Sequence, residues 1–380
     1  MDEVERKRAT AGQYAAWMKD TPDPRLAFRV TYPLPEILFV LFIGQLCGMD
    51  DVDEIVMFAR MNLDWFKGVM DFKAGIASAY TFRRVLGLID PKAFEKLFTA
   101  WATQWCNKDV VALDGKCLRG ASDTQEAHTG LYTVNAYGTQ SGLVLGQHKV
   151  HDKSNEITAI PALLDRLRIA GSIVTIDAMG TQSKIAEAIC VRGADYMLAL
   201  KGNQSALHKD VADFFADAEG LKSCCRHATV SAGHGRIEER SLQVTGDIDW
   251  LRDLHPQWKD LRCILALTSK RTHKKSGKTS TETRFFISSL APDPEHLLKV
   301  VRLHWGIENN LHWSLDVTFG EDKSTLRNTA ATNMAIIRKT AYNALKRDRS
   351  DLSLKLKRLK AAHDIRSEEH TSELQSPCNL

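Results

Sequence analysis

The chain has 380 residues, of which 44% are hydrophobic and 26% charged, and its formal net charge is +4. These values are typical of a globular protein with room for two or three domains. This net charge is too small for the protein as a whole to attract DNA. Any affinity for nucleic acid would require local basic patches. The polar N-terminus shows no secretion signal, and the apolar run at 37–47 is too short to span a membrane.

The eight cysteines are scattered and form no C-x-x-C pair. This spacing favours reduced thiols over a disulfide framework or a zinc ribbon. We therefore expect a cytoplasmic protein.

Residues 26–105 carry apolar side chains at helical spacing. Asp50-Asp51 and Asp90-Pro91 supply the N-cap and first-turn signals of two of the helices. We predict an N-terminal helical domain over residues 1–105, and residues 37–47 read as a buried helix within it.

From residue 107 the pattern changes to one typical of strands. Strands are expected at 110–114, 131–137 and 143–150, with a hairpin turn at 138–142. There follow a helix at 162–167 after Pro161, a strand ending at Asp177, a helix at 184–192 and a strand at 195–200. This order predicts an α/β fold with the mixed sheet of a ribonuclease-H-like core.

A strand-rich block at about 220–290 separates this core from two C-terminal helices, expected at 295–313 and 330–346. We interpret the block as a β-rich insertion within a catalytic domain that covers residues 106–365. Residues 366–380 have no hydrophobic period and match the translation of a common sequencing-library adapter, so we expect this tail to be non-native.

Three carboxylates in the predicted catalytic domain are candidate metal ligands. Asp114 and Asp177 each end a β-branched apolar run and should lie at the tips of neighbouring strands, about 5 Å apart. Glu308 lies on a helical pattern, and its face is expected to be packed, where an unpaired carboxylate would be costly. That face holds Val301, His304, Trp305, Leu311 and His312. Each carboxylate alone would be read as a cap or a surface charge, but three hard oxygen donors in this order favour a Mg²⁺ site.

Several longer motifs resemble those of ISAs-type insertion-sequence transposases, which are DDE enzymes that include the H-repeat-associated proteins. The resemblance covers about residues 25–363, and its motifs lie at 112–120, 153–161, 175–182, 199–204 and 304–322. It implies that Asp114, Asp177 and Glu308 form the metal-binding catalytic triad. It further implies two Mg²⁺ ions (for which Mn²⁺ could substitute), cleavage of the element ends, and attack of the freed 3′-hydroxyl on target DNA. The expected partners are double-stranded DNA and further copies of the chain bound to that DNA, with no membrane.

Two departures from the family pattern bear on activity. Residues 75–82 read Gly-Ile-Ala-Ser-Ala-Tyr-Thr-Phe where the family has Gly-Ile-Pro-Ser-His-Asp-Thr-Phe. Val301, His304 and Leu315 stand where related transposases carry a tyrosine, an arginine and a lysine. A metal-dependent nuclease, or an inactive or domesticated remnant that only binds DNA, therefore stays open as an alternative.

Basic residues supply the candidate DNA contacts. Lys116, Arg119 and Lys201 lie beside the proposed site and could contact the scissile phosphate or be ordinary solvated charges. A basic hairpin tip in the insertion could contact the DNA backbone through Lys270, Arg271, Lys274, Lys275 and Lys278. A second basic stretch at 346–360 is expected to form a helix.

The remaining charged and aromatic residues near Glu308 receive simpler interpretations. His304, Glu308 and His312 do not have the spacing of a zinc-protease helix. Asp316, Glu321 and Asp322 read as turn residues, with support of the metal site as the alternative. Trp305 and Trp313 are expected in the core.

Overall fold

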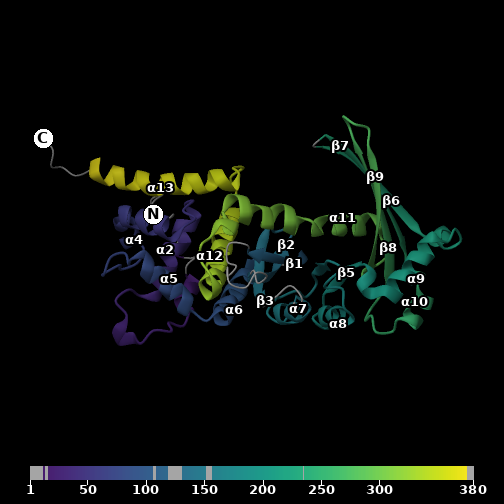
Figure 1. The fold of residues 1–380 in the computed structure, drawn as a ribbon, viewed down its shortest axis with the longest axis horizontal. Coiled ribbons are helices and arrows are strands. Elements are labelled where there is room, and N and C mark those ends of the chain that lie inside the picture. The colour runs from purple at the N-terminus through teal and green to yellow at the C-terminus, as the bar shows by residue number, and fades with distance from the viewer. Residues whose placement is uncertain are drawn as a thin grey trace.

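The computed structural model describes residue 12 and residues 16–105, 108–118, 131–150, 156–233 and 235–374; for Glu156 and for 366–374 it describes the backbone alone. Arg119, parts of the motifs at 112–120 and 153–161, and residues 375–380 of the expected tail lie outside the described residues. The elements follow one another from a helical N-terminal region through a long sheet to two C-terminal helices (Figure 1).

The N-terminal region is helical, as predicted. Its short 3-10 turns are η1 (Ala16–Asp20), η2 (Ala27–Arg29) and η3 (Thr103–Trp105). Its α-helices are α2 (Leu34–Leu46), α3 (Val52–Met61), α4 (Leu63–Lys67), α5 (Ala79–Leu88) and α6 (Pro91–Ala102).

Local capping explains where these helices begin. Asp51 caps α3 in a capping box with Glu54, and Asp90 accepts bonds from the first backbone N–H groups of α6. Ser78 caps α5 by accepting from the backbone N–H of Thr81, so this helix begins normally despite the altered segment at 75–82.

Within the described residues, the sheet has nine strands in the order β3-β2-β1-β4-β5-β9-β8-β7-β6. The core strands are β1 (Val110–Leu118), β2 (Leu131–Gly138), β3 (Leu143–Val150), β4 (Ile173–Ile176) and β5 (Asp195–Leu200). β1 pairs antiparallel with β2 and parallel with β4, which is parallel to β5. This mixed arrangement is the ribonuclease-H-like core that the sequence predicts.

The strand-rich insertion does not form a separate sheet. It contains β6 (Cys225–Gly233), β7 (Arg236–Thr245), β8 (Cys263–His273) and β9 (Thr279–Ser288), with η7 (Gly220–Ser223) before β6 and α10 (Asp249–Leu254) between β7 and β8. Because β9 pairs antiparallel with β5, the insertion continues the core sheet. The sequence indicates strands in this block only at 239–244, 263–268 and 283–288, so β6 was missed. Its exposed residues are mostly small.

Helices cover both faces of this sheet. One face packs on α7 (Glu156–Leu164), α8 (Ser183–Val191), α9 (Ser205–Ala216), which follows the short turn η6 (Gly202–Gln204), and α10. The other face packs on α11 (Pro294–His304). The helix expected after Pro161 was misplaced, because α7 already includes Pro161.

Helix α12 (Asn328–Arg347) joins the C-terminal part to the N-terminal helices, and α13 (Leu354–Leu374) runs along them (Figure 1). α2, α5 and α12 bury their apolar side chains in one common core. The side-chain amide of Asn333 on α12 donates to the backbone oxygens of Leu86 and Ile89. The division into domains at residues 105 and 106 stays a prediction.

Candidate active site

Asp114 and Asp177 each follow one residue of the last pair formed between two neighbouring parallel strands. Leu113 of β1 pairs with Ile176, the last residue of β4, so Asp114 lies within β1 and Asp177 directly after β4. Neighbouring strands lie about 4.8 Å apart, and both aspartates are half-buried. One expectation is corrected: Asp114 does not end its strand, because β1 continues along β2 to Leu118.

Backbone N–H groups orient both carboxylates. Oδ1 of Asp177 accepts from the N–H groups of Met179 at 3.1 Å and Gly180 at 3.2 Å. Oδ1 of Asp114 accepts from the N–H of Gly115 at 2.9 Å. These bonds hold each carboxylate in place before any ligand binds.

The segment after β5 braces the turn that holds Asp177. Nδ2 of Asn203 donates to the backbone oxygen of Ala178 at 2.6 Å, and Nε2 of Gln204 donates to that of Thr181 at 3.0 Å. The hydroxyl of Thr181 donates to the backbone oxygen of Ala199 at 2.6 Å. The motif at 199–204 thus has a structural role beside Asp177 that its spacing in the sequence does not reveal.

Glu308 lies on a π-helical segment that follows α11. The α-helix ends at His304, and π-helical turns cover Ile307–His312 and Ser314–Thr318. The buried side chains of Ile307, Leu311, Leu315 and Phe319 recur every four residues, a spacing that suits the wide turn of a π-helix, whose hydrogen bonds join residues five apart.

The prediction that Glu308 lies on a packed helix face is therefore wrong. The expectation assumed α-helical periodicity, whereas the wider π-helical turns leave Glu308 exposed beside the apolar face. Trp305 and Trp313 were expected in the core but are 37% and 57% exposed.

Two histidines from this helical stretch contact the strands that carry the aspartates. Nδ1 of His304 lies 2.9 Å from Oγ1 of Thr175 on β4, and Nδ1 of His312 lies 3.6 Å from Oδ2 of Asp114 on β1. Glu308 is four residues from each histidine. The helical stretch therefore crosses both strands at the end of the sheet where the aspartates lie.

Burial keeps both histidines neutral at neutral pH. Desolvation lowers the pKa of His304 to about 4, with the charge of Asp177 opposing it. Desolvation, followed by the charges of Lys116 and Lys339, lowers the pKa of His312 to about 3. His304 stands where related transposases carry an arginine, and here it is a neutral hydrogen-bonding group.

Carboxylate oxygens are the donors that Mg²⁺ prefers, and the pair of aspartates fits such an ion. Across the described residues, however, no group of three or more histidine, cysteine, aspartate or glutamate side chains is gathered as a metal ion requires. Glu308 does not complete such a group with Asp114 and Asp177 in this conformation. The role of these three residues as a triad stays a prediction.

Lys116 lies in the interior rather than at a DNA-facing surface. Its side chain is 5% exposed, and its ammonium pairs with Asp316 and lies 3.8 Å from Oε2 of Glu321. Burial raises the pKa of Asp316, which the ammonium of Lys116 opposes. Asp316 and Glu321 are therefore not simple turn residues, because they neutralise the charge of Lys116, which lies two positions after Asp114.

The other predicted basic residues that the structure describes lie on the surface. Lys201 is exposed directly after β5. Lys270 lies 3.3 Å from Glu239 and Arg271 lies 3.6 Å from Glu238, measured between nitrogen and oxygen. The exposed Lys274, Lys275 and Lys278 form the turn between β8 and β9, which confirms the hairpin.

The second basic stretch differs from expectation in part. Nζ of Lys357 donates to the backbone oxygens of Leu345 and Asp348, and Arg358 forms an ion pair with Asp50 at 2.6 Å. Both side chains are buried. They attach α13 to the rest of the chain and are not available to DNA.

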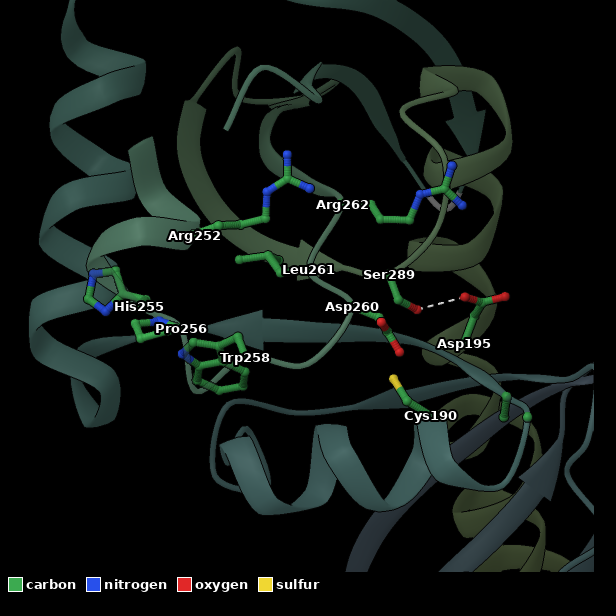
Figure 2. A pocket seen from close by; sticks show the side chains of 12 residues that line it. Cys190, Asp195, Arg252, His255, Pro256, Trp258, Asp260, Leu261, Arg262 and Ser289 are labelled. Atoms are coloured by element: carbon green, nitrogen blue, oxygen red, sulfur yellow. Dashed lines mark hydrogen bonds between the residues drawn. The ribbon is translucent and has the colours of Figure 1, made fainter. Parts of the chain in front are cut away.

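A cavity of about 670 Å³ lies away from Asp114 and Asp177. Figure 2 shows the thiol of Cys190 facing Asp260, and Ser289 bonded to Asp195 at 2.7 Å. Asp195 begins β5 and pairs with the first residue of β4, so the cavity lies roughly 13 Å from Asp177, at the opposite end of the strands. Burial raises the pKa of Cys190 to about 12, which makes it a poor nucleophile.

A family model described as Transposase DDE domain matches residues 105–344, and one described as DDE_Tnp_1-associated matches residues 16–102. The chain therefore belongs to the DDE transposase family. This confirms the resemblance carried by the sequence motifs. Members of this family generally use divalent metal ions.

Among known proteins, the chain is 37% identical to "Putative transposase YncI" of Escherichia coli O157:H7, over 90% of this chain and 89% of that protein. It is also 37% identical to "H repeat-associated putative transposase YhhI" of Escherichia coli K12, over 90% and 93% of the two chains. The cryo-EM structure of the piggyBac transposase synaptic complex with hairpin DNA is similar at 12% identity and a TM-score of 0.48, covering 97% of this chain and 80% of that one. In the described part of the chain, no helix is long and apolar enough to cross a membrane.

Proposed function

We propose that this chain is the DNA transposase of an insertion sequence, which cuts DNA at the element ends and joins the freed 3′ ends to target DNA. The observation that carries this proposal is that Asp114 and Asp177 directly follow the paired residues Leu113 of β1 and Ile176 of β4. The helical stretch that bears Glu308 crosses both strands through His304 and His312. Family membership supports the same reaction class.

In this proposal Asp114, Asp177 and Glu308 hold two Mg²⁺ ions, for which Mn²⁺ could substitute. When bound, such ions activate the attacking oxygen and stabilise the leaving oxygen of a phosphodiester. The backbone N–H groups at Met179 and Gly180 hold the Asp177 carboxylate ready for this role. The neutral His304 and His312 pack against the same strands without adding positive charge.

The reaction has two displacements at phosphorus. Water first breaks a phosphodiester at the element end and leaves a free 3′-hydroxyl. That hydroxyl then attacks a phosphodiester of the target strand, so one P–O bond forms as another breaks. No covalent intermediate with the protein is needed, and the role of the chain is to position the groups and stabilise charge.

The DNA partner would be held by basic surface residues. Lys201 and the tip residues Lys274, Lys275 and Lys278 are exposed and can contact phosphates, with an affinity that falls as salt rises. The contact predicted for Arg119 lies outside the described residues. We further propose that several copies act together on DNA, in the cytoplasm and on the nucleoid.

A DNA-binding remnant without catalysis is the second candidate, because the described conformation does not gather three metal donors. A nuclease without strand transfer is the third. Incubating the protein with Mg²⁺, labelled element-end DNA and a target plasmid separates them. The transposase predicts labelled joint molecules, a nuclease gives cleaved ends alone, and a remnant gives neither. Either of the last two results would contradict the proposal.

A further inference from the structure

Strands β6–β9 extend past α11 as an arm (Figure 1). At the base of the arm, Leu265 of β8 and Phe286 of β9 pair with each other and pack on Leu297 and Val301 of α11. The face of the arm that these side chains share is called the α11 face. The opposite face, which includes Ile264 and Ile287, packs on the side of α9 and α10.

Within the part of the chain that the structure describes, strand register places four arginines on the α11 face beyond its covered base. Side chains alternate between faces along a strand, and directly paired residues share a face. Arg284 pairs with Leu267, which lies two residues beyond Leu265. Arg240 and Arg271 occupy the next two rows outward on the same face, and Arg236, which pairs with His273, occupies the row beyond them.

This arginine face begins beside the segment that carries Glu308. The guanidinium carbon of Arg284 lies 4.9 Å from the ring centre of Trp305, in a cation–π contact. Trp305 is 37% exposed and lies three residues before Glu308. The charged surface therefore continues from the candidate active site along the arm toward the lysines of the hairpin tip.

Acidic neighbours hold the guanidinium groups in position. Glu282 accepts two bonds from Arg284, at 2.8 and 3.0 Å. Glu238 binds Arg240 and lies 3.6 Å from Arg271. The side chains of Arg271 and Arg284 stay 44% and 30% exposed in these pairs, whereas that of Arg240 is partly buried at 18%.

The outer part of the opposite face is mostly uncharged. Thr268 bonds to Thr283, and Thr272 to Thr279, across β8 and β9. Lys270 on this face is paired with Glu239. The positive charge of the outer arm is therefore concentrated on the α11 face.

We propose that the α11 face of the arm binds the phosphate backbone of double-stranded DNA beside the cleavage position, through Arg240, Arg271 and Arg284. A guanidinium can donate two parallel hydrogen bonds to a phosphate, and preformed arginines lose less freedom when they bind. This inference rests on the proposed function, because it concerns the DNA that leads away from the same site. The duplex would then contact the arm along its length and not only at the lysines of its tip.

The test measures binding without cleavage. The double variant Arg271→Gln with Arg284→Gln is compared with Arg226→Gln, an exposed arginine that lies on the opposite face because it pairs with Gln243. Fluorescence anisotropy follows a labelled duplex in EDTA between about 50 and 200 mM salt. The double variant should bind about tenfold more weakly, with a salt slope smaller by about 2, and Arg226→Gln should match wild type.

Equal losses in both variants, or no loss in the double variant, would overturn the inference. If circular dichroism shows that the double variant is unfolded, Glu282→Gln decides, because it removes an acid from the face and keeps every arginine. It should bind the duplex about threefold more tightly, and unchanged or weaker binding would contradict the proposal. Because EDTA prevents cleavage, failure here is distinct from failure of the proposed reaction.

Discussion

Nδ1 of His312 lies 3.6 Å from Oδ2 of Asp114, and only 13% of the histidine side chain is exposed. Its pKa is lowered to about 3, and that of His304 is lowered to about 4, in both cases chiefly by burial. The folded chain therefore keeps both rings neutral at a pH where the unfolded chain would already protonate them.

This arrangement predicts a loss of stability in mild acid. Between pH 6.5 and 4 the unfolded state binds more protons than the folded state at these two sites, so the free energy of unfolding falls as pH falls. From pH 7 to pH 5 each histidine should cost about 2 kcal/mol. Urea unfolding in EDTA should show that His304→Asn with His312→Asn loses less stability over this range than wild type. If the free energy of unfolding fell equally with pH in the two proteins, the prediction would be contradicted.

The ion pairs of Lys116 predict a structural rather than a DNA-binding phenotype. Lys116→Met should lower the free energy of unfolding by about 3 kcal/mol, because it leaves Asp316 and the buried Glu321 without their shared cation. Lys201→Met, at an exposed lysine, is the matched control and should change stability little. If Lys116→Met kept full stability and only weakened DNA binding, the role first expected from the sequence would be correct.

The close packing around Gly180 predicts that the turn around Asp177 does not tolerate a side chain at this position. A Cβ at this position would overlap Cγ2 of Ile176 and lie 2.9 Å from Cδ1 of Ile160, so the turn must shift. Gly180→Ala should cost about 2 kcal/mol and slow DNA cleavage about tenfold or more. Gly202→Ala is the control, because nothing lies within 4 Å of a Cβ at that position. Equal cleavage rates for the two variants would show that the Gly180 turn does not position Asp177.

The sequence predicted the core of the fold well because its signals are local. The apolar runs before Asp114 and Asp177 have the composition of buried strands, and the cap residues Asp51 and Asp90 mark helix starts in the structure as well. Motif order led to the family that the comparisons confirm.

What the sequence could not predict depends on long-range contacts. An assumed α-helical period put Glu308 on a packed face, whereas π-helical turns expose it. Lys116 and Arg358 were candidates for contact with DNA phosphates, and their burial depends on Asp316 and Asp50, respectively. No local signal shows that the insertion joins the core sheet through β5 and β9.

Cleavage of labelled element-end DNA with Mg²⁺ tests the central claim most directly, through Asp114→Asn, Asp177→Asn and Glu308→Gln. Glu187→Gln, at an exposed carboxylate on α8, is the matched control. Each of the three variants should fold normally and cleave more slowly by about a thousandfold or more, while Glu187→Gln should cleave like wild type. Undiminished cleavage in any one of the three would contradict the account by removing that residue from the site.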